Sequence, residues 1–215
     1  ILHLATAFSA LIYFWDDVKN ILKSTIKFKN DENFHFTLMI IVSMIPAGLV
    51  VFILEEKINQ LFNGNLLLVG FMLIITSLLL LISDKIKSKN RKLNAKNSLL
   101  IGLAQALAIL PGISRSGSTI ATSIFIGINR DLAAKFSFLM VIPIIVGSSL
   151  KMILFDDIVY DGSIFINYII GFFAALISGY YACKWMIFFV RKSKLKYFAL
   201  YCFIVGISSI LYSIF

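Results

Sequence analysis

The chain has 215 residues, of which 60% are hydrophobic and 14% are charged, and its mean hydropathy is +0.93. A soluble domain carries roughly 25% charged residues, so this composition excludes a soluble protein and predicts an all-α polytopic membrane protein. The net charge of +9 does not indicate nucleic acid as a partner, because the basic residues lie in short loops between apolar runs, where they signal topology and affinity for anionic lipid.

Apolar runs alternate with polar segments along the whole chain. The runs are 1–15, 36–54, 66–82, 98–128, 133–154, 164–190 and 197–215. The first is long enough only for a partial span, and 98–128 differs from the others in its polar centre. We therefore expect six transmembrane helices and one further apolar element. Because the sequence begins at Ile1, already inside an apolar run, we expect the protein to continue upstream of this residue.

Lysine and arginine are unevenly distributed among the loops. The loops at 16–35, 83–97 and 191–196 contain four, six and four of these residues, whereas those at 55–65 and 155–163 contain one and none. Short cytoplasmic loops carry an excess of lysine and arginine. The first three loops are therefore predicted to be cytoplasmic and the last two to lie outside.

This assignment constrains the segment 98–131. Residue 97 is predicted inside and residue 155 outside, and the run 133–154 accounts for one crossing, so 98–131 must cross an even number of times. Its two arms, 98–111 and 116–128, measure only about 21 and 20 Å as helices, and the hydrocarbon core is about 30 Å thick. We predict a re-entrant helical hairpin that enters from the cytoplasm, with 111–117 at its tip.

Two other readings of the segment are two full helices and one helix kinked at Pro111. Two full spans need more residues than are present, and a single kinked crossing breaks the charge alternation. With the hairpin, the chain has three spans before it and three after. We predict an inverted-repeat fold in which 1–97 is the remainder of a first repeat that lacks its hairpin and 98–215 is the second repeat with its hairpin at 98–128.

The predicted tip carries the sequence PGISRSGSTI, Pro111 to Ile120, which contains the only charged residue between Ser98 and Asn129. That residue, Arg115, has no acidic neighbour in the sequence. A cation at membrane depth costs about 2.5–3.5 kcal/mol on insertion scales and usually faces water or a partner. We therefore predict that Arg115 binds an anion supplied from outside the chain.

The residues around Arg115 suit a phosphate group. Gly112 and Gly117 permit a tight turn and a close approach of the ligand, and Ser116 or Ser118 is expected to cap the second arm. A helix N-terminus, a guanidinium group and hydroxyl groups together make a phosphate site. Arg115 would hold two oxygens and stabilise charge in a transition state, and a set of hydroxyls would fix the phosphate. These hydroxyls belong to Ser114, Ser116 and Thr119. In the alternative interpretation, the hydroxyls bond to helix carbonyls and Arg115 pairs with a distant acid.

The acidic residues of the chain all lie at segment ends or in loops, so none forms a carboxylate pair at the membrane midplane. Either there is no metal chemistry, or the metal ligands lie upstream of Ile1. Other functions are also open at this stage. A transporter or flippase for an anion or a lipid phosphate would use broken helices in the same way. A structural membrane subunit would leave Arg115 unexplained.

The stretch QALAILPGISRSGSTI, Gln105 to Ile120, resembles the arginine–serine signature of the bacterial undecaprenyl-diphosphate phosphatases, also called bacitracin-resistance proteins. GINRDLAAKFSFLMVIPIIVG (127–147) and ILHLATAFSALIYFWDDV (1–18) continue the resemblance. The resemblance implies an integral enzyme of the bacterial inner membrane with two inverted repeats, each containing a re-entrant hairpin. Such an enzyme removes the terminal phosphate of the C55 diphosphate lipid carrier and recycles the carrier for peptidoglycan synthesis.

By the same resemblance, Arg115 is the diphosphate-binding arginine, and Ser114, Ser116 and Thr119 line its pocket with Gly112 and Gly117. The family's other motif has paired glutamates, a serine and a histidine, and it is absent from residues 1–215. A divalent metal, Mg²⁺ or Ca²⁺, is therefore implied without ligands in this chain, and the chain alone is expected to be inactive. The implied partners are a polyprenyl diphosphate and membrane lipids, and a homodimer is left open.

Overall fold

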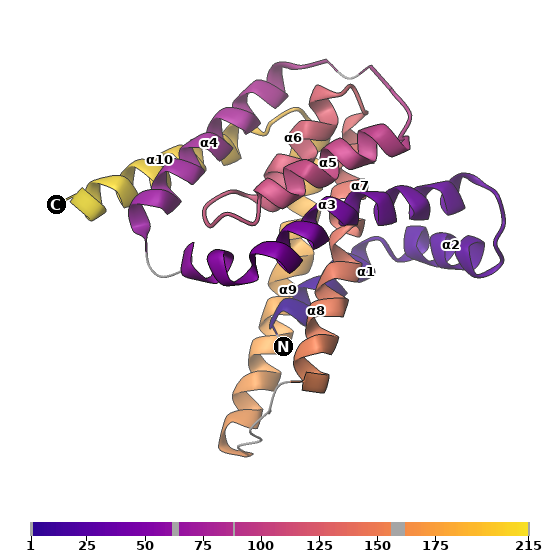
Figure 1. The fold of residues 1–215 in the computed structure, drawn as a ribbon, viewed down its shortest axis with the longest axis horizontal. Coiled ribbons are helices and arrows are strands. Elements are labelled where there is room, and N and C mark those ends of the chain that lie inside the picture. The colour runs from indigo at the N-terminus through magenta and orange to yellow at the C-terminus, as the bar shows by residue number, and fades with distance from the viewer. Residues whose placement is uncertain (1, 62–64, 88, 156–161, 215) are drawn as a thin grey trace. The chain divides into compact units, whose positions relative to one another are not determined.

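The computed structural model describes residues 2–61, 65–87, 89–155 and 162–214 (Figure 1). These residues form ten α-helices and no strand, which confirms the all-α prediction. The helices are α1 (Leu2–Tyr13), α2 (Trp15–Ile26), α3 (Glu32–Leu61), α4 (Leu66–Lys85), α5 (Ala95–Leu107), α6 (Arg115–Phe125), α7 (Arg130–Leu139), α8 (Val141–Phe155), α9 (Gly162–Arg191) and α10 (Lys196–Ile214).

Five helical segments within the described residues are long and apolar enough to cross a membrane. They are Glu32–Leu54, Leu66–Lys85, Arg130–Ser149, Ile166–Arg191 and Lys196–Ile214. Helix α1 is apolar but has only 12 residues. The chain is therefore a polytopic membrane protein, as predicted, while the count of six spans stays a prediction. The predicted outer loop at 155–163 lies mostly outside the described residues.

Part of the polar segment 16–35, expected as a loop, is instead the 12-residue helix α2. The helix is too short and too rich in aspartate and lysine to span a membrane. Its buried residues are Ile21 and Ser24, whereas Trp15, Leu22 and Ile26 are exposed. Trp15, Leu22 and Ile26 recur at i, i+7 and i+11 and therefore share one side, a spacing that is typical of an amphipathic helix. The loop prediction was wrong because it considered only average polarity and not the helical spacing of the apolar residues.

Asp31 is the last residue of the segment that connects α2 to α3. Its carboxylate accepts the hydroxyl hydrogen of Ser24 and the backbone N–H groups of Asn33 (3.1 Å) and Phe34 (3.0 Å). These bonds satisfy free donors in the first turn of α3. The Ser24 hydroxyl and the Phe34 N–H hold the pKa of Asp31 below its ordinary value, so the carboxylate stays ionised at neutral pH.

The chain divides into two compact units. Unit 1 contains Ile1–Thr37 and Phe138–Phe188, and unit 2 contains Leu38–Ser137 and Phe189–Phe215. The predicted repeat boundary after residue 97 falls inside unit 2, and the division into repeats stays a prediction. Both arms of the predicted hairpin belong to unit 2.

In unit 1, α1 packs against α8 and α9. A Cβ atom on Gly179 of α9 would lie 2.6 Å from Oγ of Ser9 of α1, so the two helices lie close together at this glycine. The rings of Phe8 and Phe172 meet edge to face, with centroids 6.2 Å apart, beside this contact. Small residues at helix crossings and aromatic pairs around them are common in membrane proteins, where packing holds the helices together.

In unit 2, α4 and α10 run side by side over much of their length (Figure 1). Gly70 and Gly206 face each other at their crossing, where a Cβ on Gly70 would lie 2.8 Å from the carbonyl oxygen of Gly206. A second close crossing joins α5 to α3, since a Cβ on Gly102 would clash with the carbonyl group of Ser43. These crossings bring α3, α4, α5 and α10 together through small residues.

One end of unit 2 is held by a pair of largely buried charges, Arg130 of α7 and Asp84 of α4. Nη2 of Arg130 donates to the carbonyl oxygens of Ser83 (3.1 Å), Asp84 (3.1 Å) and Ile86 (3.2 Å) at the end of α4, and Nη1 lies 3.7 Å from Oδ1 of Asp84. The Asp84 carboxylate also accepts the backbone N–H groups of Leu195 and Lys196. The sequence alone gave no indication of this structural role of Arg130.

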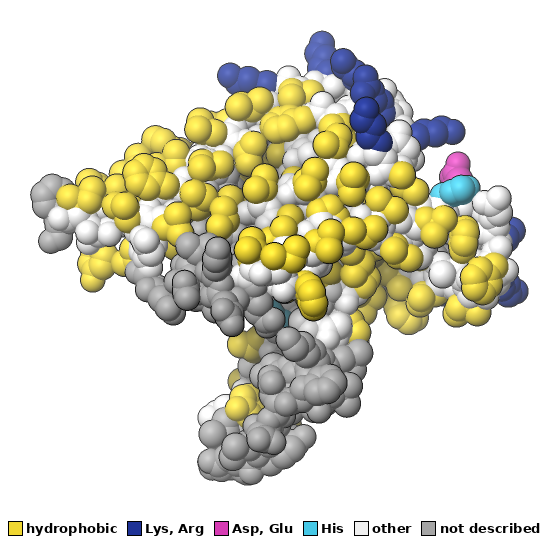
Figure 2. All heavy atoms as spheres, in the orientation of Figure 1, with side chains coloured by type: hydrophobic (Ala, Val, Ile, Leu, Met, Phe, Trp, Pro, Cys, Tyr) yellow, Lys and Arg dark blue, Asp and Glu magenta, His cyan; other side chains and the backbone are white. Residues whose placement is uncertain are grey.

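The surface fits a membrane environment. Large apolar side chains are exposed along α4 and α10, and hydrophobic side chains cover most of the described surface in Figure 2. Lysine and arginine side chains gather at the edge formed by the loop after α4. Exposed apolar belts bounded by basic residues are typical of membrane-spanning helices and their flanks.

Candidate functional site at the hairpin tip

Helices α5 and α6 pack against each other and are joined by residues 108–114. With 13 and 11 residues, they measure about 20 and 17 Å, both shorter than the hydrocarbon core of about 30 Å. Neither is among the five segments that could span a membrane. The pair has the lengths that a re-entrant hairpin requires, and its entry from the cytoplasm stays a prediction.

The turn between the two arms depends on Gly112. Its φ angle is +95°, a left-handed conformation that side chains rarely adopt. A Cβ atom at this position would also lie 2.5 Å from the carbonyl oxygen of Val69 and 3.0 Å from Cβ of Met72, both on α4. The tip therefore lies directly against α4 and has no room for a larger residue.

We expect Gly112→Ala to destabilise the protein by roughly 2–4 kcal/mol, because the substitution combines backbone strain with a clash against the α4 backbone. The matched control is Gly48→Ala, since a Cβ on Gly48 of α3 meets no atom within 4 Å and alanine has the better helix propensity. Thermal unfolding of the purified variants in detergent measures both effects. Equal melting temperatures for the two variants would show that the tip does not require glycine.

Thr76 of α4 fastens the tip through its side chain. Its hydroxyl oxygen accepts the backbone N–H of Ser114 at 3.1 Å and donates to the carbonyl oxygen of Met72 at 3.0 Å. Thr76 was not among the residues predicted from the sequence. The available signal was weak: Thr76 and Ser77 are the only polar side chains in the apolar run 66–82.

The cap of α6 is Ser114, not Ser116 or Ser118 as expected. Its hydroxyl oxygen accepts the N–H of Gly117 at 3.1 Å, and its carbonyl oxygen accepts the N–H of Ser118 at 2.8 Å. The expectation was wrong because the helix begins at Arg115, two residues earlier than a cap at Ser116 requires. Gly117 is suited to this cap, since a Cβ there would lie 3.0 Å from the capping oxygen. The hydroxyl of Ser118 is buried and has no hydrogen-bond partner among the described residues.

Arg115 and Ser116, the first two residues of α6, present donors that the protein leaves available. Within the described residues, no acid forms an ion pair with Arg115, which is exposed. The hydrogen bonds among the described residues of the tip use the N–H groups of Ser114, Gly117 and Ser118 but not those of Arg115 and Ser116. A helix N-terminus with unused N–H groups, a guanidinium group and a nearby hydroxyl forms an anion site.

Thr119 lies deeper than the other predicted residues and is only 1% exposed. Its hydroxyl oxygen lies at donor distance from the carbonyl oxygens of Arg115 (2.9 Å) and Ser116 (3.2 Å), and the two can share its hydrogen. It also lies 2.5 Å from Oγ of Ser137 on α7. The structure thus brings Gly112, Ser114, Arg115, Ser116 and Gly117 together at the tip and places Thr119 behind them. Ser137, which was not predicted from the sequence, connects this part of α6 to α7.

The residues at the tip do not suit a metal ion. They offer a guanidinium group, hydroxyls and N–H donors, and a permanent cation repels a divalent metal. Within the part of the chain that the structure describes, no group of three or more His, Cys, Asp or Glu residues gathers in one place. We therefore attribute no metal chemistry to these residues.

Comparisons with known proteins agree with the arrangement at the tip. Residues 1–208 match the family described as Bacitracin resistance protein BacA. A protein of Christiangramia forsetii named undecaprenyl-diphosphatase is 47% identical over 99% of this chain and 81% of its own length. Proteins of the same name from Bacteroides fragilis (44% identical; 99% and 82% covered) and Methanobrevibacter smithii (36%; 96% and 80%) also match. The resemblance carried by Gln105–Ile120 is confirmed, and the chain belongs to the Bacitracin resistance protein BacA family.

Proposed function

We propose that this protein hydrolyses undecaprenyl diphosphate to undecaprenyl phosphate and inorganic phosphate, which recycles the lipid carrier for cell-wall synthesis. Relatives named undecaprenyl-diphosphatase are 41–47% identical over nearly the whole chain and support this reaction. At the site, the observation that supports it best is Arg115 at the N-terminus of α6, without an acidic partner among the described residues and with unused N–H donors beside it.

Arg115 would bind the diphosphate through two parallel N–H···O bonds from its planar guanidinium group. The N–H groups of Arg115 and Ser116, the Ser116 hydroxyl and the positive end of the helix dipole would contact the remaining oxygens. During hydrolysis, the terminal phosphorus gains an oxygen that comes from water and loses its bond to the bridging oxygen, and the lipid phosphate leaves with the extra negative charge. Fixed donors at this position stabilise that charge without having to reorganise.

The other residues hold these donors in place. Ser114 caps α6 and is itself bound by Thr76, while Gly112 and Gly117 allow the close packing of the turn. Thr119 fixes the first turn of α6 through the carbonyl groups of Arg115 and Ser116. We therefore assign direct phosphate contacts to Arg115 and Ser116 and positioning roles to the rest.

The chain is a membrane protein, and we place it in the inner membrane of a bacterium with a polyprenyl diphosphate as its lipid partner. A homodimer stays a prediction. A transporter or flippase is the less favoured alternative, because the named relatives are hydrolases.

The test is phosphate release from undecaprenyl diphosphate by the purified full-length protein in detergent. We expect one phosphate to be released per lipid, with undecaprenyl phosphate as the only lipid product. Undecaprenyl phosphate itself serves as the control substrate and should release none. Binding of the diphosphate lipid without phosphate release would disprove the enzyme and favour the transporter.

A further inference from the structure

Helices α4 and α10 form an open groove of about 370 Å³. No residue of the hairpin tip is among its lining residues. Its lining residues are Ser77, Leu81, Lys196, Tyr197, Leu200 and Phe203. Lys196, Leu200 and Phe203 follow the i, i+4, i+7 spacing of one face of α10, and Ser77 and Leu81 follow the i, i+4 spacing on α4. The groove is therefore mostly apolar and runs along two packed helices, with Lys196 at one end.

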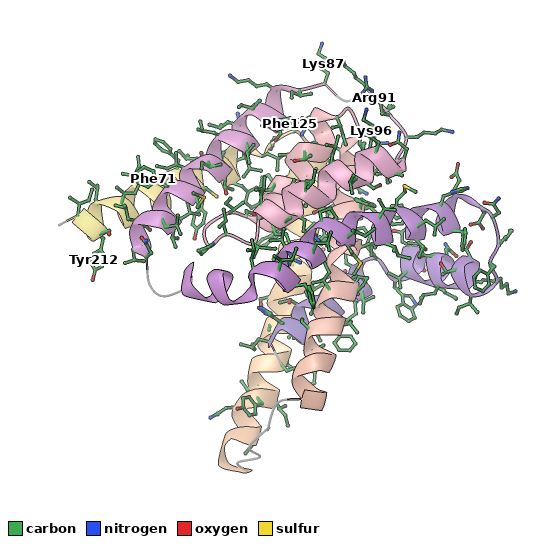
Figure 3. The ribbon with its side chains drawn as sticks, viewed as in Figure 1. Phe71, Lys87, Arg91, Lys96, Phe125 and Tyr212 are labelled. Atoms are coloured by element: carbon green, nitrogen blue, oxygen red, sulfur yellow. The ribbon has the colours of Figure 1, made fainter. Side chains whose placement is uncertain are left out.

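The lysine marks the basic end of unit 2. Lys196 is the first residue of α10, Lys85 is the last residue of α4, and both are exposed. The two helix ends are joined because Asp84 accepts the N–H groups of Leu195 and Lys196. In Figure 3, Lys87 and Arg91 lie at this end of α4, while Phe71 lies toward the other end.

The end of the groove at Lys196, called its mouth below, carries a net positive charge. Asp84 is the only acid near it in the sequence, and its carboxylate is already engaged by Arg130 and by two backbone N–H groups. The Lys196 ammonium lies 5.5 Å from the centre of the Tyr197 ring and has no acidic partner within the described residues. Its stem lines the apolar groove while its charged end remains available, as is typical of lysine at a membrane interface.

The length of the groove matches the upper part of one lipid leaflet. Lys196 and Phe203 are seven residues apart, or about 10 Å along the helix axis, and half of the hydrocarbon core measures about 15 Å. A lipid whose headgroup lies at Lys196 would therefore place the first methylene groups of its chain beside Leu81, Leu200 and Phe203. Leu200 is 57% exposed, so a chain can reach it.

We propose that this groove binds one anionic glycerophospholipid, with its phosphate at Lys196 and an acyl chain along Leu81, Leu200 and Phe203. An anionic headgroup is complementary to the mouth, whereas a zwitterionic headgroup brings its own cation toward the basic residues. Each lysine or arginine near an anionic headgroup contributes about 1 kcal/mol, which corresponds to roughly fivefold in affinity. The site does not depend on the proposed hydrolysis, because no residue that binds the diphosphate lines it.

The experiment uses full-length protein in nanodiscs that contain equal amounts of phosphatidylglycerol and phosphatidylcholine. Retained lipids are counted by native mass spectrometry after mild detergent extraction. We expect at least roughly fivefold enrichment of phosphatidylglycerol and a loss of most of it in Lys196→Gln. The matched control is Lys194→Gln, which removes an exposed charge two residues away that does not line the groove and should change the enrichment less than twofold.

A second pair of variants tests the apolar part of the groove. Leu200→Trp should fill the groove and lower retention of phosphatidylglycerol while Lys196 is intact, whereas Leu211→Trp, exposed on the same helix outside the groove, should not. Melting temperatures equal to that of the wild type would show that both variants are folded. Equal retention of the two phospholipids, or equal effects of Lys196→Gln and Lys194→Gln, would overturn the proposal. Displacement of phosphatidylglycerol by an equal concentration of undecaprenyl phosphate would assign the groove to the substrate or product instead.

Discussion

Replacing Arg115 with lysine is expected to lower kcat/KM for undecaprenyl diphosphate by about 10²–10³, the range measured when one preorganised donor to a developing oxyanion is removed. Lysine retains the positive charge but not the planar fork that holds two phosphate oxygens at once. The ammonium group of lysine is also more strongly hydrated than a guanidinium group and costs more to bring into contact with the phosphate. The loss should appear mainly in kcat if the lost contacts strengthen in the transition state.

The matched control is Arg191→Lys in the same full-length protein. Arg191 forms an exposed ion pair with Asp131, with side-chain exposures of 56% and 66%, and it is not part of the tip. Exposed pairs contribute about 0–1 kcal/mol to stability, and lysine preserves this one, so phosphate release should stay within twofold of the wild type. Wild-type rates in Arg115→Lys would remove the guanidinium from the proposed mechanism, and equal losses in both variants would indicate a general effect of arginine replacement.

The sequence predicts the helices of this fold better than their ends. Apolar runs at 66–82 and 197–215 correspond closely to α4 and α10, because a helix of about 20 apolar residues has few alternatives in a membrane. The predicted run 133–154 appears as two helices, α7 and α8, which meet at Met140. Hydropathy does not reveal such a break, since the residues directly around it, Phe138 to Ile142, are all apolar.

The residues of the tip were predicted from their types, whereas their separate roles depend on contacts that hydropathy does not encode. Arg115 stands out because a lone cation in an apolar run requires a reason. The cap is Ser114 and not Ser116 or Ser118 because α6 begins at Arg115, two residues earlier than a cap at Ser116 requires. The support from Thr76 joins positions 38 residues apart in the chain, so only the folded structure shows it.

The pattern of hydroxyl bonds also separates two interpretations that the sequence left open. Thr119 bonds to helix carbonyls, as the alternative interpretation held, while Arg115 lacks an acidic partner within the described residues, as the phosphate-site interpretation held. The alternative interpretation therefore holds for the Thr119 hydroxyl, and phosphate binding at Arg115 stays a prediction. A short serine- and threonine-rich helix needs some hydroxyls for its own packing, and only those near its first turn are available to a ligand.

The largest stability effect is expected at the opposite end of unit 2, where Arg130→Met should lower the free energy of unfolding by about 3–5 kcal/mol. The Arg130 and Asp84 side chains are only 11% and 10% exposed. Removing the guanidinium leaves the Asp84 carboxylate buried without its cation and removes the donor to three carbonyl oxygens at the end of α4. An uncompensated buried charge is costly because few water molecules can replace its partner.

The matched control is Asp131→Asn, which breaks the exposed ion pair with Arg191 and should cost less than about 1 kcal/mol. Unfolding in mixed micelles with increasing dodecyl sulfate would measure both. A double-mutant cycle with Asp84→Asn then isolates the buried pair: the second substitution removes the orphaned charge, so Asp84→Asn should cost less in the Arg130→Met background than in the wild type. Additive costs would mean that Arg130 stabilises the end of α4 through the carbonyl groups alone. Because Asp84 also holds the first N–H groups of α10, a strong coupling would show that this one ion pair joins the ends of three helices.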